Sequence, residues 1–339
     1  PYDAIAHRTR PCAEACGVKA IESDELVRAK INPDKCVSCG MCMVSCPFGA
    51  IADKSQFFQL IRALRRGDKI VAEVAPSYLG QFGEKATPAK IRAALLELGF
   101  ADVFEVALGA DMGAATEAAH YAERVATGKQ PFMLTSCCPS WAMLIRHYFP
   151  ESADKLSNTL TPMVATARTI KKKCPDCRVV FIGPCAAKKL EASRRAEHSD
   201  VDFVITFEEL SAIFEAKGID FEKFGKEAEM NDATGAGRGY AVAGGVAGAI
   251  EKCIRAYYPG VEVNMQHAEG LEDCRKILLL AKMGRLNGAL IEGMGCPGGC
   301  VAGAGTNIPV AKAASLVKKT AETSSSPIPP KELAEIRLD

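Results

Sequence analysis

The chain has 339 residues, 48% of them hydrophobic and 24% charged, with a formal net charge of +1. This balance excludes the strongly basic surface of a nucleic-acid-binding protein, and apolar stretches such as 240–250 are too short and too rich in glycine to span a membrane. The 15 cysteines are grouped in tight spacings rather than spread as in a secreted disulfide scaffold, so metal or redox chemistry is the first hypothesis.

A run of closely spaced cysteines lies near the N-terminus, in KCVSCGMCMVSCPFGAI. Its members have the spacing C-x2-C-x2-C-x3-C followed by proline, and they are Cys36, Cys39, Cys42 and Cys46. The short gaps let successive thiolates reach neighbouring irons of one cubane, and the proline directs the chain away. A zinc site would normally use two separated C-x2-C pairs. The run therefore predicts a 4Fe-4S cluster.

An upstream segment, PCAEACGVKAI, ends in the same C-x3-A-I pattern as the downstream run. In two-cluster ferredoxins the fourth cysteine of each run binds the other cluster. We therefore expect Cys16 to complete the cluster held by the first three cysteines of the run. Cys12 and Cys46 then remain for a second cluster, which lacks two thiolates here. The opening residues PYDAI resemble the tail of a further run, whose cysteines would precede residue 1.

From about residue 60, apolar runs alternate with helical patterns. Strands are predicted at 69–76, 103–107, 132–136, 178–183, 202–206 and 288–294, and helices at 88–99 and 111–128. This alternation is typical of a mostly parallel sheet with helices on its faces. The predicted units are residues 1–56, a small ferredoxin-like domain; 57–320, an α/β domain; and 321–339, a Ser/Pro-rich, loosely held extension.

Three of the predicted strands run into cysteine, in FMLTSCC, VVFIGPC and ALIEGMGC. Ligands of α/β sheets bind outside the carboxyl ends of the strands. We therefore expect the cysteines of these loops to converge, namely Cys138, Cys185, Cys296 and Cys300. Proline and glycine flank each of them, Pro184 among them, as expected where the backbone turns sharply near a bulky inorganic group. Four thiolates suggest a second cubane, and the alternative is four unrelated core cysteines.

The same loops, TSCCPSW at 135–141, GPCAAKKLE at 183–191 and EGMGCPGGCVAGAG at 292–305, resemble the three signature loops of iron-only, or [FeFe], hydrogenases in order and approximate spacing. The resemblance covers about 65–310. It implies a two-lobed α/β hydrogenase catalytic domain preceded by a small α+β ferredoxin-like domain. It also implies reversible interconversion of dihydrogen with protons and electrons, in an anaerobic, cytoplasmic setting.

The resemblance further implies which cofactor the four converging cysteines hold. They would bind a 4Fe-4S cube, with Cys300 also bridging to a two-iron unit that carries carbonyl, cyanide and aza-dithiolate ligands. Cube and two-iron unit together form the H-cluster, which separate maturation proteins install. One or two additional 4Fe-4S clusters would pass electrons to ferredoxin or a similar carrier.

Cys137, the neighbour of the ligand Cys138, would be the proton relay in such a hydrogenase. An ordinary thiol pKa near 8.5 leaves it protonated at neutral pH and still able to cycle. Glu117, Ser157 and Arg124 match the farther members of the family's proton route. The second glutamate of that route is replaced by His120, whose imidazole can also relay protons. Without the resemblance, Glu117 and His120, which lie three residues apart in a predicted helix, could simply form a polar face.

Other residues match the family's contacts with the two-iron unit. Lys188 would anchor a cyanide through its three donors, with Glu191 orienting it; the alternative is a solvated lysine. Met294 would pack beside the bridge, although as a lone methionine it would be core. Pro76 and Ser77 resemble the segment that contacts the second cyanide.

The sequence also departs from the family pattern at several positions. Gly183 stands where methionine is usual, which would remove side-chain packing around the two-iron unit. Ser140 replaces a glycine, and GAG at 303–305 replaces three glycines. These differences predict a divergent subgroup.

Two other functions remain open: a hydrogen-sensing member with slow turnover, and the non-catalytic branch that serves iron-sulfur assembly or nuclear interactions. The presence of Cys137, Lys188 and Met294 favours the catalytic branch.

Four cysteines lie outside this scheme. Cys174 and Cys177, in KKCPDC, would bind a metal only with two further ligands, and a surface loop is the favoured interpretation. Cys253 and Cys274 fall in predicted helices, where core packing is the default.

Overall fold

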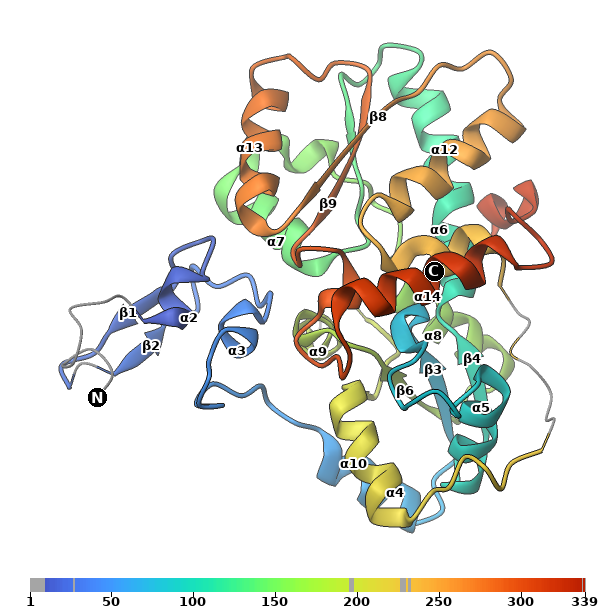
Figure 1. The fold of residues 1–339 in the computed structure, drawn as a ribbon. Helices are drawn as coiled ribbons and strands as arrows, with labels where there is room; N and C mark the ends of the chain where they lie inside the picture. The colour runs from blue at the N-terminus through green and yellow to red at the C-terminus, as the bar shows by residue number, and fades with distance from the viewer. Residues whose placement is uncertain are drawn as a thin grey trace.

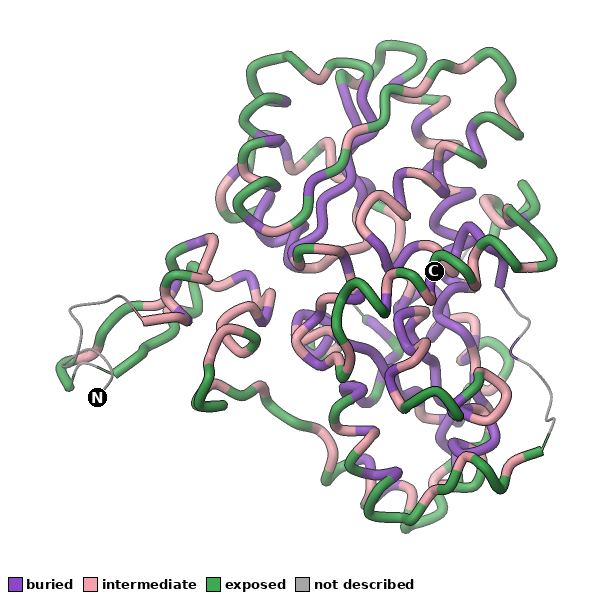
Figure 2. Tube along the Cα trace, in the orientation of Figure 1, coloured by how far each residue is buried: buried purple, intermediate pink, exposed green. Residues whose placement is uncertain are grey.

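The structure, a computed structural model, describes residues 10–26, 28–194, 198–225, 230, 233–336 and 338. Two lobes, each with its own sheet, form the body, and the Cys-rich N-terminal segment lies beside it (Figure 1). Buried residues fill most strands of both lobes, whereas the N-terminal segment is largely exposed or half-buried (Figure 2). The opening PYDAI, expected to end a further cysteine run, lies outside the described residues.

The N-terminal segment repeats one local structure. Its elements are α2 (Pro11–Glu14), β1 (Ile21–Ser23), β2 (Ala29–Ile31) and α3 (Met41–Val44), with β1 antiparallel to β2. After α2, the N–H of Ala20 donates to the sulfur of Cys16 at 3.2 Å. After α3, the N–H of Ala50 donates to the sulfur of Cys46 at 3.4 Å. The two C-x3-A segments therefore fold alike, as expected for a pseudo-repeat.

One lobe is built on a parallel sheet with strand order β4-β3-β6-β7, hereafter the β3 sheet. Its elements are α4 (Phe57–Arg65), β3 (Ile70–Val74), η1 (Pro76–Tyr78), α5 (Pro88–Glu97), β4 (Asp102–Glu105), α8 (Pro162–Lys173), β6 (Arg178–Ile182), α9 (Ala186–Ser193), β7 (Phe203–Ile205) and α10 (Phe207–Lys217). All five residues of β3 are buried, which is typical of a parallel strand covered on both faces.

The other lobe is built on a parallel sheet with strand order β5-β9-β8, hereafter the β9 sheet. Its elements are α6 (Ala107–His120), the π-helical turn η2 (Tyr121–Val125), β5 (Met133–Leu134), α7 (Pro139–Tyr148), η3 (Pro150–Lys155), α11 (Gly235–Arg238), η5 (Gly239–Ala241), α12 (Gly245–Tyr257), β8 (Asn264–Glu269), α13 (Leu271–Lys282), β9 (Ala289–Met294), η6 (Cys300–Ala302) and α14 (Val310–Glu322).

Several predicted boundaries differ from the structure. The strand predicted at 103–107 ends at Glu105 because α6 begins at Ala107, four residues before the predicted helix. The strand predicted at 132–136 shortens to two residues because the backbone leaves the sheet to form the cysteine loop. β8 was not predicted; its sequence NMQHAE is polar and mostly exposed, so it carries no apolar signal.

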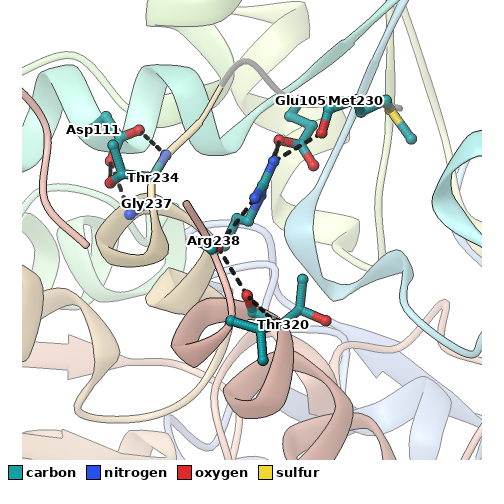
Figure 3. Close-up of polar contacts among 9 residues, drawn as sticks. Glu105, Asp111, Met230, Thr234, Gly237, Arg238 and Thr320 are labelled. Atoms are coloured by element: carbon teal, nitrogen blue, oxygen red, sulfur yellow. Dashed lines mark hydrogen bonds and ion pairs between the residues drawn. The ribbon is translucent and has the colours of Figure 1, made fainter. Parts of the chain in front are cut away.

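A buried carboxylate joins α6 to α11 (Figure 3). Asp111 accepts hydrogen bonds from the N–H of Thr234 at 2.7 Å, the Thr234 hydroxyl at 2.5 Å and the N–H of Gly237 at 2.9 Å. It thereby satisfies donors at the start of a short helix, which have no partner within the helix itself.

A half-buried arginine extends this network toward α14 (Figure 3). Arg238 pairs with Glu105 at 2.8 Å, donates to the carbonyl of Met230 at 2.8 Å and to the hydroxyl of Ser324 at 3.0 Å. Ser324 in turn donates to the carbonyl of Thr320 at 2.8 Å. The network therefore connects β4 of one lobe with α11 and the end of α14.

The C-terminal extension is held more tightly than its composition predicts. The N–H of Gly235 donates to the carbonyl of Ser326 at 2.8 Å, and the N–H of Ala236 to that of Pro327 at 3.0 Å. The hydroxyl of Tyr257 bonds to the carbonyl of Pro329, and η7 (Lys331–Glu335) follows against α6. The prediction of a loosely held tail was wrong because backbone carbonyls of the tail satisfy donors of α11 and α12, which composition does not reveal.

Gly293 in β9 provides a test of the packing between the β9 sheet and α7. A Cβ at Gly293 would lie 2.1 Å from Cδ2 of the fully buried Trp141. We expect Gly293→Ala to destabilise the protein by about 1–3 kcal/mol, because the close-packed ring must move. Thermal unfolding followed by circular dichroism would show a melting temperature lowered by several degrees.

The matched control is Gly248→Ala in α12, where a Cβ would meet nothing within 4 Å. It should leave the melting temperature unchanged or raise it, since alanine favours a helix over glycine by about 0.5–1 kcal/mol. Equal melting temperatures for both variants would contradict the described packing of Trp141.

Candidate functional site

The cysteines that follow the strands line one cavity between the lobes. Cys138 follows β5, Cys185 follows β6, and Cys296 and Cys300 follow β9; all four face this cavity, as does Cys137. They meet because the carboxyl ends of the strands of both sheets point to the same region. We call this space the four-thiol cavity.

The loop between the two cysteines after β9 depends on glycine. Gly298 and Gly299 have φ of +96° and +89°, a region that side-chain-bearing residues rarely adopt. A Cβ at Gly299 would also lie 2.6 Å from the backbone nitrogen of Ala243. The CPGGC segment therefore brings Cys296 and Cys300 to the same wall by a turn that only glycine permits.

The cavity disfavours charge on its thiols in the absence of a metal. Burial, followed by repulsion from Cys138, raises the pKa of Cys185 to about 11. Burial, followed by repulsion from Cys185, also raises the pKa of Cys300. Thiolates gathered here need a positively charged partner, and irons that deprotonate their ligands supply it. The donor set thus suits a cubane, whose separate irons each bind one thiolate.

Two buried hydroxyls at this cavity lack a protein partner. Ser77, on η1 after β3, and Tyr240, on η5, both line the four-thiol cavity. Neither hydroxyl has a hydrogen-bond partner among the residues that the structure describes. Buried polar groups are nearly always hydrogen-bonded, so these two suit a bound group that offers acceptor atoms. Ser77 was predicted, whereas Tyr240 was missed; its one signal was an aromatic residue beside the glycine-rich stretch 241–249.

A buried ammonium also faces the four-thiol cavity. Lys188 on α9 pairs with Glu191 at 2.6 Å, and both side chains are buried. Burial alone would lower the pKa of Lys188, but Glu191 outweighs this effect and raises it. Lys188 therefore stays charged, with donors left for a ligand. Pro76, Pro184 and Met294 complete the apolar wall.

Sequence reasoning missed a carboxyl close to this ion pair. Glu73 lies in the middle of β3, is fully buried, and has no hydrogen-bond partner for either oxygen within the described part of the chain. Burial raises its pKa well above the ordinary value, opposed by the charge of Lys188. The available signal was a single glutamate inside the apolar run KIVAEVAP, which is unusual for a covered strand.

The cavity wall near Gly183 is not left open, contrary to expectation. A Cβ at Gly183 would lie 2.5 Å from the ring of Phe181 and 3.0 Å from Cβ of Ala75. Phe181 itself lines the four-thiol cavity. The expectation that side-chain packing is lost at Gly183 was therefore wrong, because the ring of Phe181, two residues upstream, fills the space.

The inner members of the predicted proton route lie in one neighbourhood beside the cavity. Glu117 on α6 is buried, accepts from the N–H of Ser136 at 3.3 Å and hydrogen-bonds with Ser157. Burial, only partly offset by these bonds, raises the pKa of Glu117 to about 7. Burial, followed by repulsion from Glu292, holds the pKa of Cys137 well above its usual range. Cys137 is thus a neutral thiol that shares its surroundings with a carboxyl able to titrate near neutrality.

The outer part of the predicted route is less connected. Nδ1 of His120 is buried and has no hydrogen-bond partner in the described chain. Burial, followed by the nearby charge of Arg124, lowers the pKa of His120. Ser157, by contrast, lines a second cavity that also contains Glu191 and Arg194. The structure brings Cys137, Glu117 and Ser157 together and leaves His120 without a bond to them.

The N-terminal cysteines gather around a separate cavity. Its lining includes Cys16, Cys36, Cys39 and Cys42 but neither Cys12 nor Cys46, which lie at the neighbouring helices α2 and α3. The prediction of a second N-terminal cluster stays a prediction. The sulfur of Cys296 lies 3.9 Å from the carbonyl oxygen of Cys39, so the two thiol-lined cavities adjoin each other.

Two findings concern what the described residues lack. No group of three or more His, Cys, Asp or Glu side chains in the described ranges is placed to hold one metal ion; a cubane distributes its thiolates over separate irons instead. Among the helices described, none is long and apolar enough to cross a membrane.

Comparison with known proteins identifies related sequences. The family described as iron only hydrogenase large subunit, C-terminal domain, matches residues 68–304, and a 4Fe-4S binding domain matches 29–52. The NADP-reducing hydrogenase subunit HndD of Solidesulfovibrio fructosivorans is 30% identical over 80% of this chain and 55% of its own length. Iron hydrogenase 1 of Clostridium pasteurianum is 29% identical over 76% of this chain and 54% of its own length. The chain thus spans about half the length of these relatives.

A solved structure and a non-hydrogenase relative are also similar. A variant of [FeFe]-hydrogenase HydA1 from Chlamydomonas reinhardtii superposes with a TM-score of 0.62 at 22% identity, covering 82% of this chain and 92% of that one. The cytosolic Fe-S cluster assembly factor NAR1 of Yarrowia lipolytica is 26% identical over 58% of this chain and 46% of its own length.

The contact between Phe181 and Gly183 predicts that Gly183→Met destabilises the wild-type protein but stabilises a variant that lacks the Phe181 ring. Gly183→Met should destabilise the protein by about 1–3 kcal/mol, because the new side chain overlaps the ring. Phe181→Ala should cost about 3–5 kcal/mol by leaving a cavity. In the Phe181→Ala background, Gly183→Met should instead raise the melting temperature, since the methionine enters the vacated space. If the changes in melting temperature of the two single variants simply added in the double variant, the contact between Phe181 and residue 183 would be contradicted.

Proposed function

The chain belongs to the iron-only hydrogenase family, and we propose that it interconverts dihydrogen with two protons and two electrons at an H-cluster. The family and the two-lobed α/β fold with its N-terminal 4Fe-4S segment are established. Family membership alone does not establish the activity, because the chain spans only about half the length of the related hydrogenases. The observation that carries the proposal is a row of proton-bearing side chains that ends at a cavity lined by four further thiols.

We assign the cofactor contacts by position in the four-thiol cavity. Cys138, Cys185, Cys296 and Cys300 would hold the cube, and the last of these would also bind the two-iron unit. The cluster would supply an open iron site and a basic amine at which the H–H bond is split or formed. The chemistry of that step belongs to the cofactor, and the protein contributes binding, orientation and a dry environment.

The polar groups of the wall would orient the two-iron unit. The Lys188 ammonium and the unpartnered hydroxyl of Ser77 would each donate to a cyanide, and Glu191 would hold the lysine in place. Tyr240 would add a donor that sequence comparison alone did not suggest. The apolar wall, including Met294 and the Phe181 ring, would exclude water.

Cys137 would carry the proton between this cavity and Glu117, and Glu117 would pass it to Ser157. His120 and Arg124 would complete the predicted route to the surface. The second cavity beside Ser157 supports an additional exit lined by polar groups, where ordered water could bridge the gap. Electrons would leave through the N-terminal cluster, which the contact between Cys39 and Cys296 supports, to ferredoxin or a similar carrier.

The main alternative is a non-catalytic role in iron-sulfur assembly, which similarity to NAR1 brings into view. A hydrogen-sensing role with slow turnover is the other. The two differ from the proposal in what they require: an assembly factor needs neither a neutral thiol at 137 nor a titrating carboxyl behind it, whereas a sensor would keep both and turn over slowly.

The role of Cys137 predicts a selective loss of turnover. In protein loaded by the maturation proteins, Cys137→Ser should lower hydrogen evolution by about 10²- to 10⁴-fold, because proton transfer by a positioned group contributes that much. Iron content should not change. Hydrogen evolution from reduced methyl viologen measures the effect.

The control is Cys253→Ser, which alters a fully buried thiol of α12 that does not line the cavity. It should retain wild-type turnover. Wild-type protein that is fully loaded yet inactive would overturn the hydrogenase proposal, and an active Cys137→Ser variant would overturn the assigned route alone.

The titration of Glu117 predicts opposite pH dependences for the two directions of the reaction. A relay carboxyl must be protonated to deliver a proton and ionised to accept one. Burial raises the pKa of Glu117 to about 7. Hydrogen evolution should therefore fall, and hydrogen oxidation should rise, as the pH increases through about 7. Glu117→Gln should slow both directions by about 10²-fold or more and remove this inflection.

Glu97→Gln, at an exposed position of α5, is the matched control and should reproduce the wild-type pH profile. An unchanged inflection in Glu117→Gln would show that another group determines it.

A further inference from the structure

Two cysteines lie at the end of the β3 sheet that is remote from the four-thiol cavity. Cys174 caps the C-terminus of α8, and Cys177 immediately precedes β6. The cavity lies beyond the opposite end of β6, roughly 20 Å away at about 3.3 Å per residue. Neither cysteine lines either thiol cavity. Their role is therefore separate from cluster binding.

The local geometry places the two sulfurs together beside a cation. The N–H of Cys177 donates to the carbonyl of Cys174 at 3.2 Å, which closes the CPDC segment into a tight turn. The two thiols hydrogen-bond with each other, and the Lys69 ammonium hydrogen-bonds with the sulfur of Cys174. The backbone of Lys69 is held beside this turn because its carbonyl accepts the N–H of Arg178 at 2.8 Å, at the start of β6.

The two thiols differ in access and in acidity. Cys174 is half-buried, whereas Cys177 is 1% exposed and belongs to the core of the β3 sheet. Burial alone would raise the pKa of Cys174, but hydrogen bonds from Cys177 and Lys69 outweigh it and lower the pKa. Burial, followed by the bond with Cys174, raises the pKa of Cys177 to about 11. An accessible, acidic thiol beside a buried, basic one is the arrangement of an attacking and a resolving cysteine.

A structural metal does not account for this pair. Zinc would need two more ligands, and within the described residues no third His, Cys, Asp or Glu joins these two cysteines in a group placed to hold an ion. An inert surface loop would not require the lysine, nor two sulfurs in hydrogen-bond contact.

We propose that Cys174 and Cys177 form a redox-active dithiol that exchanges with small-molecule disulfides. The Cys174 thiolate attacks one sulfur of the incoming disulfide, forms a mixed disulfide and releases the first thiolate. The Cys177 thiolate, formed as its proton passes to that leaving group or to solvent, then attacks the sulfur of Cys174. This step closes the Cys174–Cys177 disulfide and releases the second thiol. Two electrons pass from the protein dithiol to the small disulfide.

The CPDC segment allows a direct test that is independent of hydrogenase activity. The cluster-loaded protein is incubated anaerobically with oxidised glutathione, alkylated and digested with trypsin. Cleavage after Lys173 and Arg178 releases both cysteines in one peptide, CPDCR. The expected product is this peptide with an internal disulfide, which carries no alkyl group and is two hydrogens lighter than the unalkylated dithiol, while Cys253 and Cys274 are alkylated as free thiols.

Three variants separate the assigned roles. Cys177→Ser should accumulate glutathione on Cys174, because no resolving thiol remains, whereas Cys174→Ser should accumulate little on the buried Cys177. Lys69→Met should slow exchange at neutral pH by about tenfold through a smaller thiolate fraction. Lys129→Met, at an exposed lysine after η2, should exchange at the wild-type rate.

A CPDCR peptide that stays reduced in wild-type protein would overturn the proposal. So would mixed disulfides that form equally fast on either cysteine. Exchange at the wild-type rate in Lys69→Met would overturn the role of the ammonium.

Discussion

The carboxyl ends of β3 and β6 in one sheet meet those of β5 and β9 in the other, and the rest of the structure depends on this meeting. Each strand delivers one loop to the four-thiol cavity. Because parallel strands need helical crossovers, the segments between these loops form helices that cover both sheets. The hydrogen bonds of the buried Asp111 and the half-buried Arg238 then connect β4 and α6 with α11 and α14.

Charge inside this cavity is the second constraint. Isolated buried thiolates are costly, and the raised pKa of Cys185 shows that the protein alone favours the neutral form. The Lys188 ammonium is balanced by Glu191, while Glu73 remains protonated through burial. The site therefore carries little net charge until a metal cluster provides it, and it keeps donors such as the hydroxyls of Ser77 and Tyr240 without protein partners.

The sequence predicted the parts of this arrangement that are local. The spacing of the cysteines from Cys36 to Cys46 indicated a 4Fe-4S motif, which the family match over 29–52 confirms. Apolar runs ending in cysteine indicated the strands that converge. It did not reveal contacts that arise only after folding. The Phe181 ring fills space at Gly183, the tail after α14 satisfies donors of α11, and β8 is a polar edge strand. None of these leaves a periodic or spacing signal: the position of the Phe181 ring and the contacts of the tail exist only in the folded chain, and the sequence of β8 is polar.

Infrared spectroscopy of protein loaded by the maturation proteins would decide whether the four-thiol cavity holds an H-cluster, because carbonyl and cyanide ligands absorb where protein does not. We expect carbonyl and cyanide bands that shift under dihydrogen, and cyanide bands that move in Lys188→Met because the ammonium no longer donates to the cyanide. Absence of these bands in protein whose 4Fe-4S cubes are fully assembled would rule out the H-cluster and would favour a role in iron-sulfur assembly.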